Sequence, residues 1–121
     1  MSVLRDDIED LQNRYDDGLT ADEAGEEEYA TLEEFLDRLE AGEIRAAEKR
    51  DGEWVANSWV KRGILLNFGL RHIRTHTHGG VDYHDVLPLR ETDDLPGRGT
   101  RNTPDGTVIR RGAYIGGDAI V

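Results

Sequence analysis

An aliphatic side chain recurs every six residues at the end of this 121-residue chain. The repeating positions and the small residues four places after two of them are Ile109, Ala113, Ile115, Ala119 and Val121. A period of six with small residues at a fixed offset is typical of a parallel β-helix, in which one aliphatic side chain per hexad points inward. Such coils bury their apolar side chains only by stacking on one another. We therefore expect residues 107–121 to begin a β-helix of which this sequence holds only the first coil.

The front of the chain has helical spacing instead. Over residues 2–16, one apolar face repeats at intervals of three and four, and Gly18 marks its end. Two capping boxes, at 20–23 and 31–34, leave two possible starts for a second helix, whose stronger half is 29–41. Gly42 supplies the left-handed residue that ends this helix. The face of the first helix consists of Leu4, Ile8, Leu11 and Tyr15.

The next segment changes period. Asp51-Gly52 separates two short runs and predicts a β-hairpin, because both turn positions need positive φ. A third helix, 59–68 with Ser58 as its cap, is apolar on most sides and should be central to the core. Trp54 and Trp59 are interpreted as core anchors. Beyond them we expect a loop over 69–80, an extended run over 83–90 and a linker over 91–106.

Charge and composition exclude several classes of protein. The net charge is −11, and residues 1–53 alone carry 19 acidic and 6 basic side chains. So acidic a front half argues against nucleic acid or an anionic membrane as partner. The chain has no cysteine, which excludes a disulfide framework and Cys-ligated zinc. No apolar run approaches the roughly 20 residues of a membrane span, and the first residues lack a signal pattern. We expect a cytoplasmic α+β protein whose residues 1–90 form one small domain.

The middle and end of the chain resemble a known family. The resemblance rests on four segments: 39–55, with Gly42, the Ala-Glu-Lys of 47–49 and Asp51-Gly-Glu-Trp54; 59–68, from Trp-Val-Lys-Arg to Phe68; Tyr83, Asp85 and Pro88; and 101–115, with Arg101-Asn-Thr-Pro104 and Ile109-Arg-Arg-Gly-Ala-Tyr-Ile115. Taken together, in order and spacing, they resemble the N-terminal region of tetrahydrodipicolinate N-succinyltransferase. The resemblance implies that 107–121 enters a left-handed parallel β-helix built of hexapeptide repeats.

That family implies a function. Its members transfer a succinyl group from succinyl-CoA, a cosubstrate, to the amino group of ring-opened tetrahydrodipicolinate in the diaminopimelate route to lysine. They are homotrimers, have no covalently bound cofactor, and bind a small-molecule dicarboxylate between subunits. Most of the β-helix, with the family's catalytic acid and CoA groove, lies outside this sequence. We therefore expect no catalytic residue and no transfer activity in these 121 residues alone.

One residue of the family's substrate site maps onto this sequence. The Arg of the family's Arg-x-x-Pro motif corresponds to Arg101, which the resemblance implies binds a substrate carboxylate. A guanidinium suits that role because it pairs bidentately with carboxylates. Spacing alone favours a plainer interpretation, a linker arginine paired with a nearby aspartate.

Two further clusters allow other functions. Histidines 72, 76, 78 and 84, with Asp82 and Asp85 among them, could supply three imidazoles to zinc or nickel, although their spacing matches no standard site. A mobile polar loop without metal is the plainer interpretation. Arginines 98, 101, 110 and 111 could grip phosphate or CoA, but charges on the outer corner of a coil explain them more simply. A non-catalytic interaction module, docking through the acidic helices or the open coil, is the remaining alternative.

Overall fold

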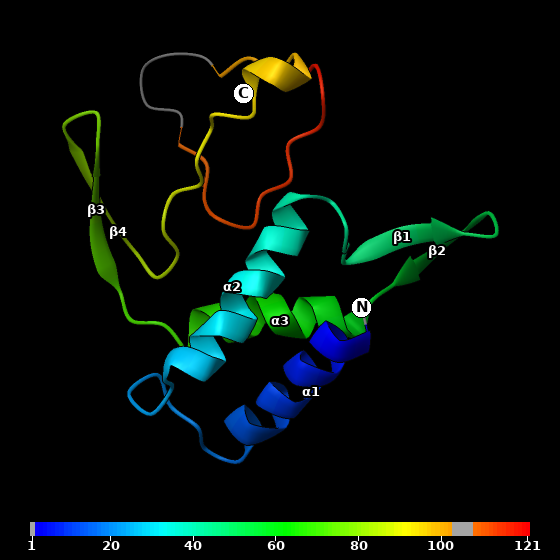
Figure 1. The fold of residues 1–121 in the computed structure, drawn as a ribbon, viewed down its shortest axis with the longest axis vertical. Coiled ribbons are helices and arrows are strands. Elements are labelled where there is room, and N and C mark those ends of the chain that lie inside the picture. Colours follow the sequence, from blue (N-terminus) through cyan, green and yellow to red (C-terminus); the bar gives the residue numbers. More distant parts are fainter. Residues whose placement is uncertain (1, 103–107) are drawn as a thin grey trace.

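The computed structural model describes residues 2–102 and 108–121 and has the expected α+β composition. The helices and the two antiparallel hairpins follow one another in the order shown in Figure 1. None of the described helices combines the length and apolarity needed to cross a membrane. The elements are α1 (Ser2–Asp16), α2 (Glu26–Glu40), β1 (Ala47–Arg50), β2 (Glu53–Ala56), α3 (Ser58–Gly69), β3 (Arg74–His78), β4 (Val81–Asp85) and the 3-10 turn η1 (Pro96–Arg98).

Helix α1 presents the face that its spacing predicts. Leu4, Ile8 and Leu11 are each at most 3% exposed and belong to the main core. Tyr15, expected on the same face, is 39% exposed and lies against Gly69 at the end of α3. Gly18 adopts φ 110° just after the helix, as expected for a stop signal.

Helix α2 begins between the two predicted caps. Its first turn starts after Gly25, whose backbone N–H donates to Glu28 Oε1 at 2.7 Å. Thr20 does pair with Glu23, but in a turn before the helix, and Thr31 lies within it. The three glutamates at 26–28 explain this start, because negative side chains are favoured at a helix N-terminus.

Helix α3 packs across α1 and α2 and closes the core. Phe35 meets the Trp59 ring edge to face, with centroids 6.2 Å apart, which confirms Trp59 as a core residue. Gly63 lets the Phe35 ring approach the α3 backbone closely. The helix is not surrounded by protein as predicted: Leu65 is 55% exposed and Phe68 is 39% exposed. One face of α3 is core and the other is surface.

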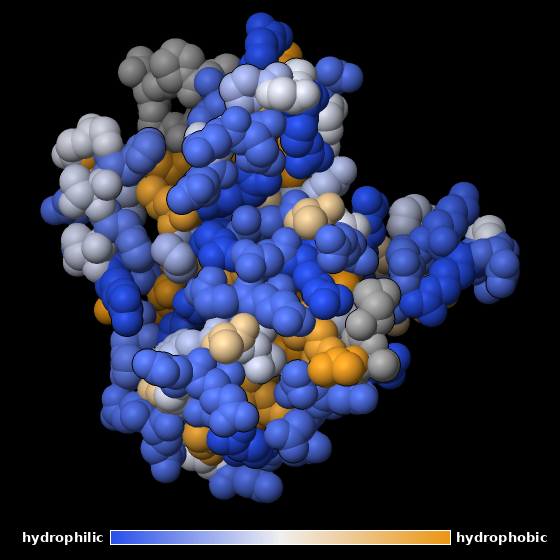
Figure 2. Space-filling model, viewed as in Figure 1, coloured by the Kyte–Doolittle hydropathy of each residue, from blue (hydrophilic) through white to orange (hydrophobic). Residues whose placement is uncertain are grey.

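The Asp51-Gly52 hairpin forms as predicted. Asp51 and Gly52 adopt φ 49° and φ 80°, and the register pairs Arg50 with Glu53. The hairpin projects away from the helices and is covered mainly by hydrophilic side chains (Figures 1 and 2). Trp54 on β2 is therefore 74% exposed, and its interpretation as a core anchor is wrong.

A second hairpin replaces the loop expected over residues 69–80. Strands β3 and β4 pair antiparallel around Gly79 and Gly80, whose φ values are 60° and 78°. Gly-Gly is a known two-residue turn for hairpins. The prediction failed because β3 reads Arg-Thr-His-Thr-His, so no alternation of apolar and polar side chains marks it as a strand.

The end of the chain folds back over two earlier segments. Leu89 and Arg110 form an antiparallel bridge, whereas Arg101 and Ile120 form a parallel one. Of the expected linker, residues 91–102 are described; they include η1, and Leu95 is 2% exposed. Residues 103–106 of that linker and Thr107 of the expected coil lie outside the described residues. The division into 1–90, 91–106 and 107–121 stays a prediction.

Candidate functional site

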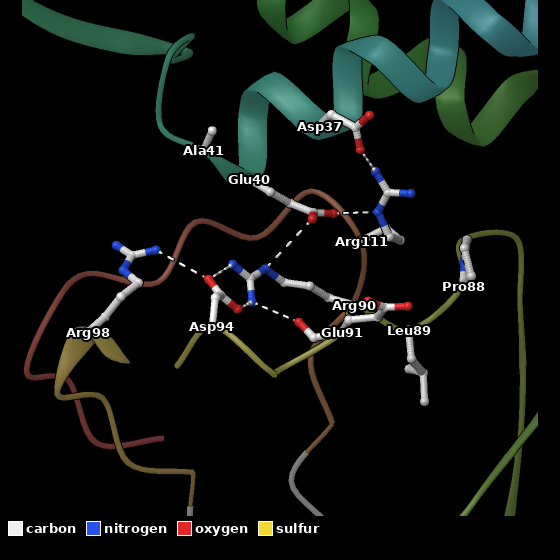
Figure 3. A pocket seen from close by; sticks show the side chains of 10 residues that line it. All are labelled: Asp37, Glu40, Ala41, Pro88, Leu89, Arg90, Glu91, Asp94, Arg98 and Arg111. Atoms are coloured by element: carbon white, nitrogen blue, oxygen red, sulfur yellow. Dashed lines mark hydrogen bonds and ion pairs between the residues drawn. The ribbon is translucent and has the colours of Figure 1, made fainter. Parts of the chain in front are cut away.

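The C-terminal half of α2 and the folded-back tail enclose a pocket of about 560 Å³. Figure 3 shows its charged side chains converging from α2, from the segment after β4 and from the tail. Because three parts of the chain far apart in sequence meet here, this pocket joins the helical part to the tail. Its lining residues are Asp37, Glu40, Ala41, Pro88, Leu89, Arg90, Glu91, Asp94, Arg98 and Arg111.

Arg111 is the centre of this junction. Its guanidinium donates to Glu33 at 2.7 Å, to Asp37 at 2.6 Å and to Glu40 at 2.5 Å, and its side chain is 17% exposed. Glu33, Asp37 and Glu40 are spaced by four and three residues, so they share one face of α2. Burial alone would lower the pKa of Arg111, but hydrogen bonds and charge from Glu40 and Glu33 raise that pKa above its ordinary value.

Arg90 is a second buried arginine in the wall of this pocket. Its side chain is 5% exposed and makes a two-pronged contact with Asp94, at 3.1 Å and 3.0 Å. These hydrogen bonds from Arg90 hold the pKa of the Asp94 carboxyl below its ordinary value. Arg90 Nε is buried without a hydrogen-bond partner among the described residues; Glu40 Oε1 lies 3.7 Å away.

The pocket is a junction rather than an anion site. Its three arginines face the carboxylates of Asp37, Glu40, Glu91 and Asp94, so its charged walls neutralise one another. The guanidinium of Arg98 also lies 5.1 Å from the ring centre of Tyr114, which ties the tail to η1. What the arrangement does is fix the position of the tail relative to α2.

Arg101 lies outside this pocket and is exposed. Its backbone N–H donates to Ala119 O at 2.9 Å, and its carbonyl accepts from Val121 N at 2.8 Å. Nearby, the Thr100 hydroxyl donates to Gly116 O at 3.0 Å. Within residues 2–102 and 108–121, no side chain pairs with the Arg101 guanidinium, so the paired linker arginine that spacing favoured is not seen there. The backbone of Arg101 is thus fixed by the tail while its charge faces solvent.

The expected cluster of four arginines is dispersed by the fold. Arg111 points to α2, whereas Arg110 pairs with Asp85 at 2.8 Å and lies 5.0 Å from the ring centre of Phe68. The view of Arg111 as a charge on an outer corner is therefore wrong. The signal that points to its role is the row of carboxylates at 33, 37 and 40 on one face of α2, with which Arg111 pairs.

The hairpin register separates the histidines. His76 and His78 lie on one face of β3, while His84 pairs across from Thr75 on the opposite face. His72 instead meets Asp22 at 3.1 Å. The described part of the chain contains no group of three His, Asp or Glu side chains placed to hold a metal ion. The metal-binding alternative therefore has no support, and His84 in particular cannot converge with His76 and His78 from the opposite face of the hairpin.

Comparison with known proteins identifies the family. A family model described as "Tetrahydrodipicolinate N-succinyltransferase N-terminal" matches residues 3–70. Curated relatives named 2,3,4,5-tetrahydropyridine-2,6-dicarboxylate N-succinyltransferase include those of Alkalilimnicola ehrlichii, 40% identical over 70% of this chain and 32% of the relative, and Tolumonas auensis, 34% identical over the whole chain and 45% of the relative. The relative from Coxiella burnetii is 32% identical over the whole of this chain and 45% of its own length.

The matched part of this chain thus spans 32% to 45% of the length of these relatives. The interaction-module alternative gains nothing from them, since each relative carries the name of a transferase. With the family model covering more than half of its residues, this chain belongs to the tetrahydrodipicolinate N-succinyltransferase family, whose N-terminal region it represents.

Proposed function

We propose that this chain is the N-terminal part of an enzyme that transfers succinyl from succinyl-CoA to the amino group of ring-opened tetrahydrodipicolinate, a step of lysine biosynthesis through diaminopimelate. Membership of the family supports the reaction class, and the relatives' shared name supports the dicarboxylate acceptor. In this proposal residues 1–90 form a helical domain beside the substrate site, and the tail begins the coil that carries it.

The observation that carries the proposal is the parallel pairing of Arg101 with Ile120. Parallel strands need a long connection, which is usually an α-helix. Between these two residues the described part of the chain has no helix, so the chain turns and returns beside itself. That path is typical of a solenoid coil. It supports a β-helix that starts here, left-handed by the family resemblance.

Burial along the tail supports the same arrangement. The hexad residue Ile109 is 7% exposed, and the hexad residues at 115 and 121 are partly buried. Ile120, one place out of phase, is 62% exposed. The period-six pattern therefore matches the inward side of the tail, as one rung of a stacked coil requires.

Arg101 is the residue proposed to bind a carboxylate of the dicarboxylate substrate. Its backbone is held in the parallel bridge, and its guanidinium is exposed without a side-chain partner in the described ranges. A fixed backbone that carries an unpaired, planar guanidinium group suits bidentate binding of a carboxylate. Arg111 and Arg90 do not suit it, because carboxylates of the protein already occupy them.

The remaining features of the proposal concern the whole protein. We propose a cytoplasmic homotrimer that uses succinyl-CoA as cosubstrate and needs no covalently bound cofactor, nucleic acid or membrane. Residues 1–121 alone should not catalyse the transfer, because no acid and no CoA groove are assigned within them. Succinyl transfer should be measured with the complete enzyme.

Steady-state kinetics of the complete enzyme test the role of Arg101. Arg101→Ala should raise KM for tetrahydrodipicolinate by about tenfold or more, because a charge-assisted hydrogen-bond pair is lost. KM for succinyl-CoA should change little. Arg101→Lys should raise this KM less than Arg101→Ala does, since lysine keeps the positive charge but cannot bind a carboxylate bidentately.

The matched control is Arg62→Ala, which removes an exposed arginine from α3, far in sequence from the bridge. This variant should behave as wild type. An equal rise in KM for both substrates in Arg101→Ala, or an unchanged KM for the dicarboxylate, would contradict the proposal. If the complete enzyme transferred no succinyl group, the proposed reaction class would be wrong.

A further inference from the structure

A second, smaller pocket lies between the N-terminal half of α2 and strand β3. Its volume is about 280 Å³, and its polar wall is made by Glu33, Arg71, His72, Arg74 and His76. We propose that it binds a small oxyanion, a carboxylate or phosphate group, through Arg71, Arg74 and His76. None of these residues belongs to the pairing around Arg101, so the proposal stands apart from the proposed function.

The charge of this wall is opposite to that of the chain as a whole. The chain carries a net charge of −11, but here two arginines and two histidines surround a single carboxylate, Glu33. Glu33 is also engaged outside the pocket, because its Oε2 accepts from Arg111 at 2.7 Å. His72 is already paired with Asp22 at 3.1 Å, and Arg71 with Asn67 and Glu33. Arg74 and His76 are therefore the donors of the wall that have no partner among the described residues, and an anion would supply the acceptor.

The clearest sign of a missing acceptor is at His76. Its Nε2 is buried and has no hydrogen-bond partner among the described residues. Buried polar atoms without partners are rare in folded proteins, and each calls for an explanation. On the other face of the same hairpin, the ring of His84 is paired with Thr75 at 3.0 Å. The open nitrogen is the one that belongs to a residue lining the pocket.

Arg71 is held in place before any ligand binds. The buried Asn67 accepts from its Nε at 3.1 Å, Glu33 accepts from its Nη2 at 3.0 Å, and its side chain is 12% exposed. Its guanidinium carbon lies 6.0 Å from the ring centre of Tyr29. Among the described residues no hydrogen bond reaches its Nη1. Arg74, on β3, has no side-chain partner in these ranges either. One fixed and one free guanidinium thus face the same space.

The size of the pocket limits the ligand. Pockets for small molecules hold about 300–1,000 Å³, so this one, at about 280 Å³, lies just below that range. Val86 and Pro88 close its remaining side with apolar surface. A compact group such as inorganic phosphate or a short dicarboxylate matches both the volume and the donors.

Calorimetric titration of the full chain with inorganic phosphate, and separately with succinate, tests this proposal. Ionic strength is held constant, and sodium chloride serves as the reference. At least one oxyanion should bind saturably, and the tighter of the two identifies the class of anion. Arg74→Ala and His76→Ala should each weaken binding by about tenfold or more, because each removes a donor to a charged acceptor.

Two control variants make the result specific. His78→Ala removes a histidine from the same face of β3 that does not line the pocket, and binding should not change. Arg62→Ala, which removes an exposed arginine of α3 that does not line the pocket, should also leave binding unchanged. Arg74 is exposed at the start of β3, so Arg74→Ala keeps the test valid even if His76→Ala disturbs the hairpin. Absence of saturable binding by both anions, or equal weakening in His78→Ala and Arg74→Ala, would overturn the proposal.

Discussion

Arg111 Nε donates to Glu40 Oε2 at 2.5 Å, and the same carboxylate oxygen accepts from the backbone N–H of Gly112 at 2.7 Å. One glutamate at the end of α2 therefore holds both a side chain and the main chain of the tail. Glu33 and Asp37 complete the contact with Arg111. This cluster ties the tail to helix α2 through both side-chain and main-chain contacts.

Loss of Arg111 should be costly. Arg111→Met should lower the free energy of unfolding by about 1–3 kcal/mol, because it leaves the largely buried Glu40 without its cation. Glu33 and Asp37, which are 42% and 71% exposed, lose less. Urea unfolding measures this change. Arg50→Met is the control, since the Arg50–Glu48 pair is exposed to solvent and such pairs contribute little to stability. Equal effects of the two variants would show that the cluster does not stabilise the fold.

Acid should weaken the junction through Glu33. Burial opposes ionisation of Glu33, but the hydrogen bonds and charges of Arg71 and Arg111 outweigh it and lower the pKa of the carboxyl below 4.5. A carboxyl whose pKa is lower in the folded state stabilises the fold above its unfolded pKa, and this stabilisation is lost as pH falls through the folded value. Stability should therefore fall on acidification below about pH 4.5.

The variant Glu33→Gln isolates this contribution. It should be less stable than wild type at neutral pH and lose less stability on acidification, as measured by urea unfolding over a pH series. The neighbouring Glu34→Gln is the matched control, because Glu34 is half exposed and, among the described residues, pairs with Arg38 alone, at 3.5 Å. A Glu33→Gln profile parallel to that of wild type would rule out this role for Glu33.

The helical core has a position with no room for a methyl group. In Gly63→Ala, the new Cβ would collide with the ring of Phe35. Overpacking of this kind costs about 1–3 kcal/mol, and thermal unfolding should reveal the loss. Gly97→Ala, where no described residue lies within 4 Å of the added Cβ, should unfold close to wild type. A Gly63→Ala protein as stable as wild type would contradict the close packing of α2 against α3.

The two tryptophans should report different environments. Trp59 packs edge to face on Phe35, whereas Trp54 is 74% exposed on the β1–β2 hairpin. Trp54→Phe should therefore leave a blue-shifted, protected emission from Trp59, and Trp59→Phe a red-shifted emission from Trp54 that a soluble quencher reduces strongly. Similar quenching of both single-tryptophan proteins would refute this assignment.

Local signals predicted much of the fold, and long-range pairing explains most of the rest. The face of α1 and the Asp51-Gly52 turn are local patterns, and both formed as expected. The second hairpin was missed although Gly79-Gly80 is a turn signal, because its first strand, β3, shows no alternation of apolar and polar side chains. Trp54 was misplaced because a strand pattern does not say whether its hairpin packs on the core.

The candidate site likewise has one part that local sequence patterns indicate and another that depends on long-range contacts. The carboxylates at 33, 37 and 40 are visible in the sequence as one helical face, but their partner lies more than 70 residues away. No spacing rule connects positions so far apart. The separation of His84 from His76 depends on the register of a hairpin that the sequence did not predict. The role of Arg101 came from family resemblance and stays a prediction.

A crystal structure of the complete enzyme with the dicarboxylate substrate tests the central proposal most directly. We predict that the Arg101 guanidinium lies about 2.7–2.9 Å from a substrate carboxylate oxygen, the distance of a charge-assisted hydrogen bond. We also predict that the bridge to Ile120 persists as the first rung of the coil. A bound substrate without contact to Arg101, or a tail that leaves Arg101 to fold elsewhere, would contradict this account.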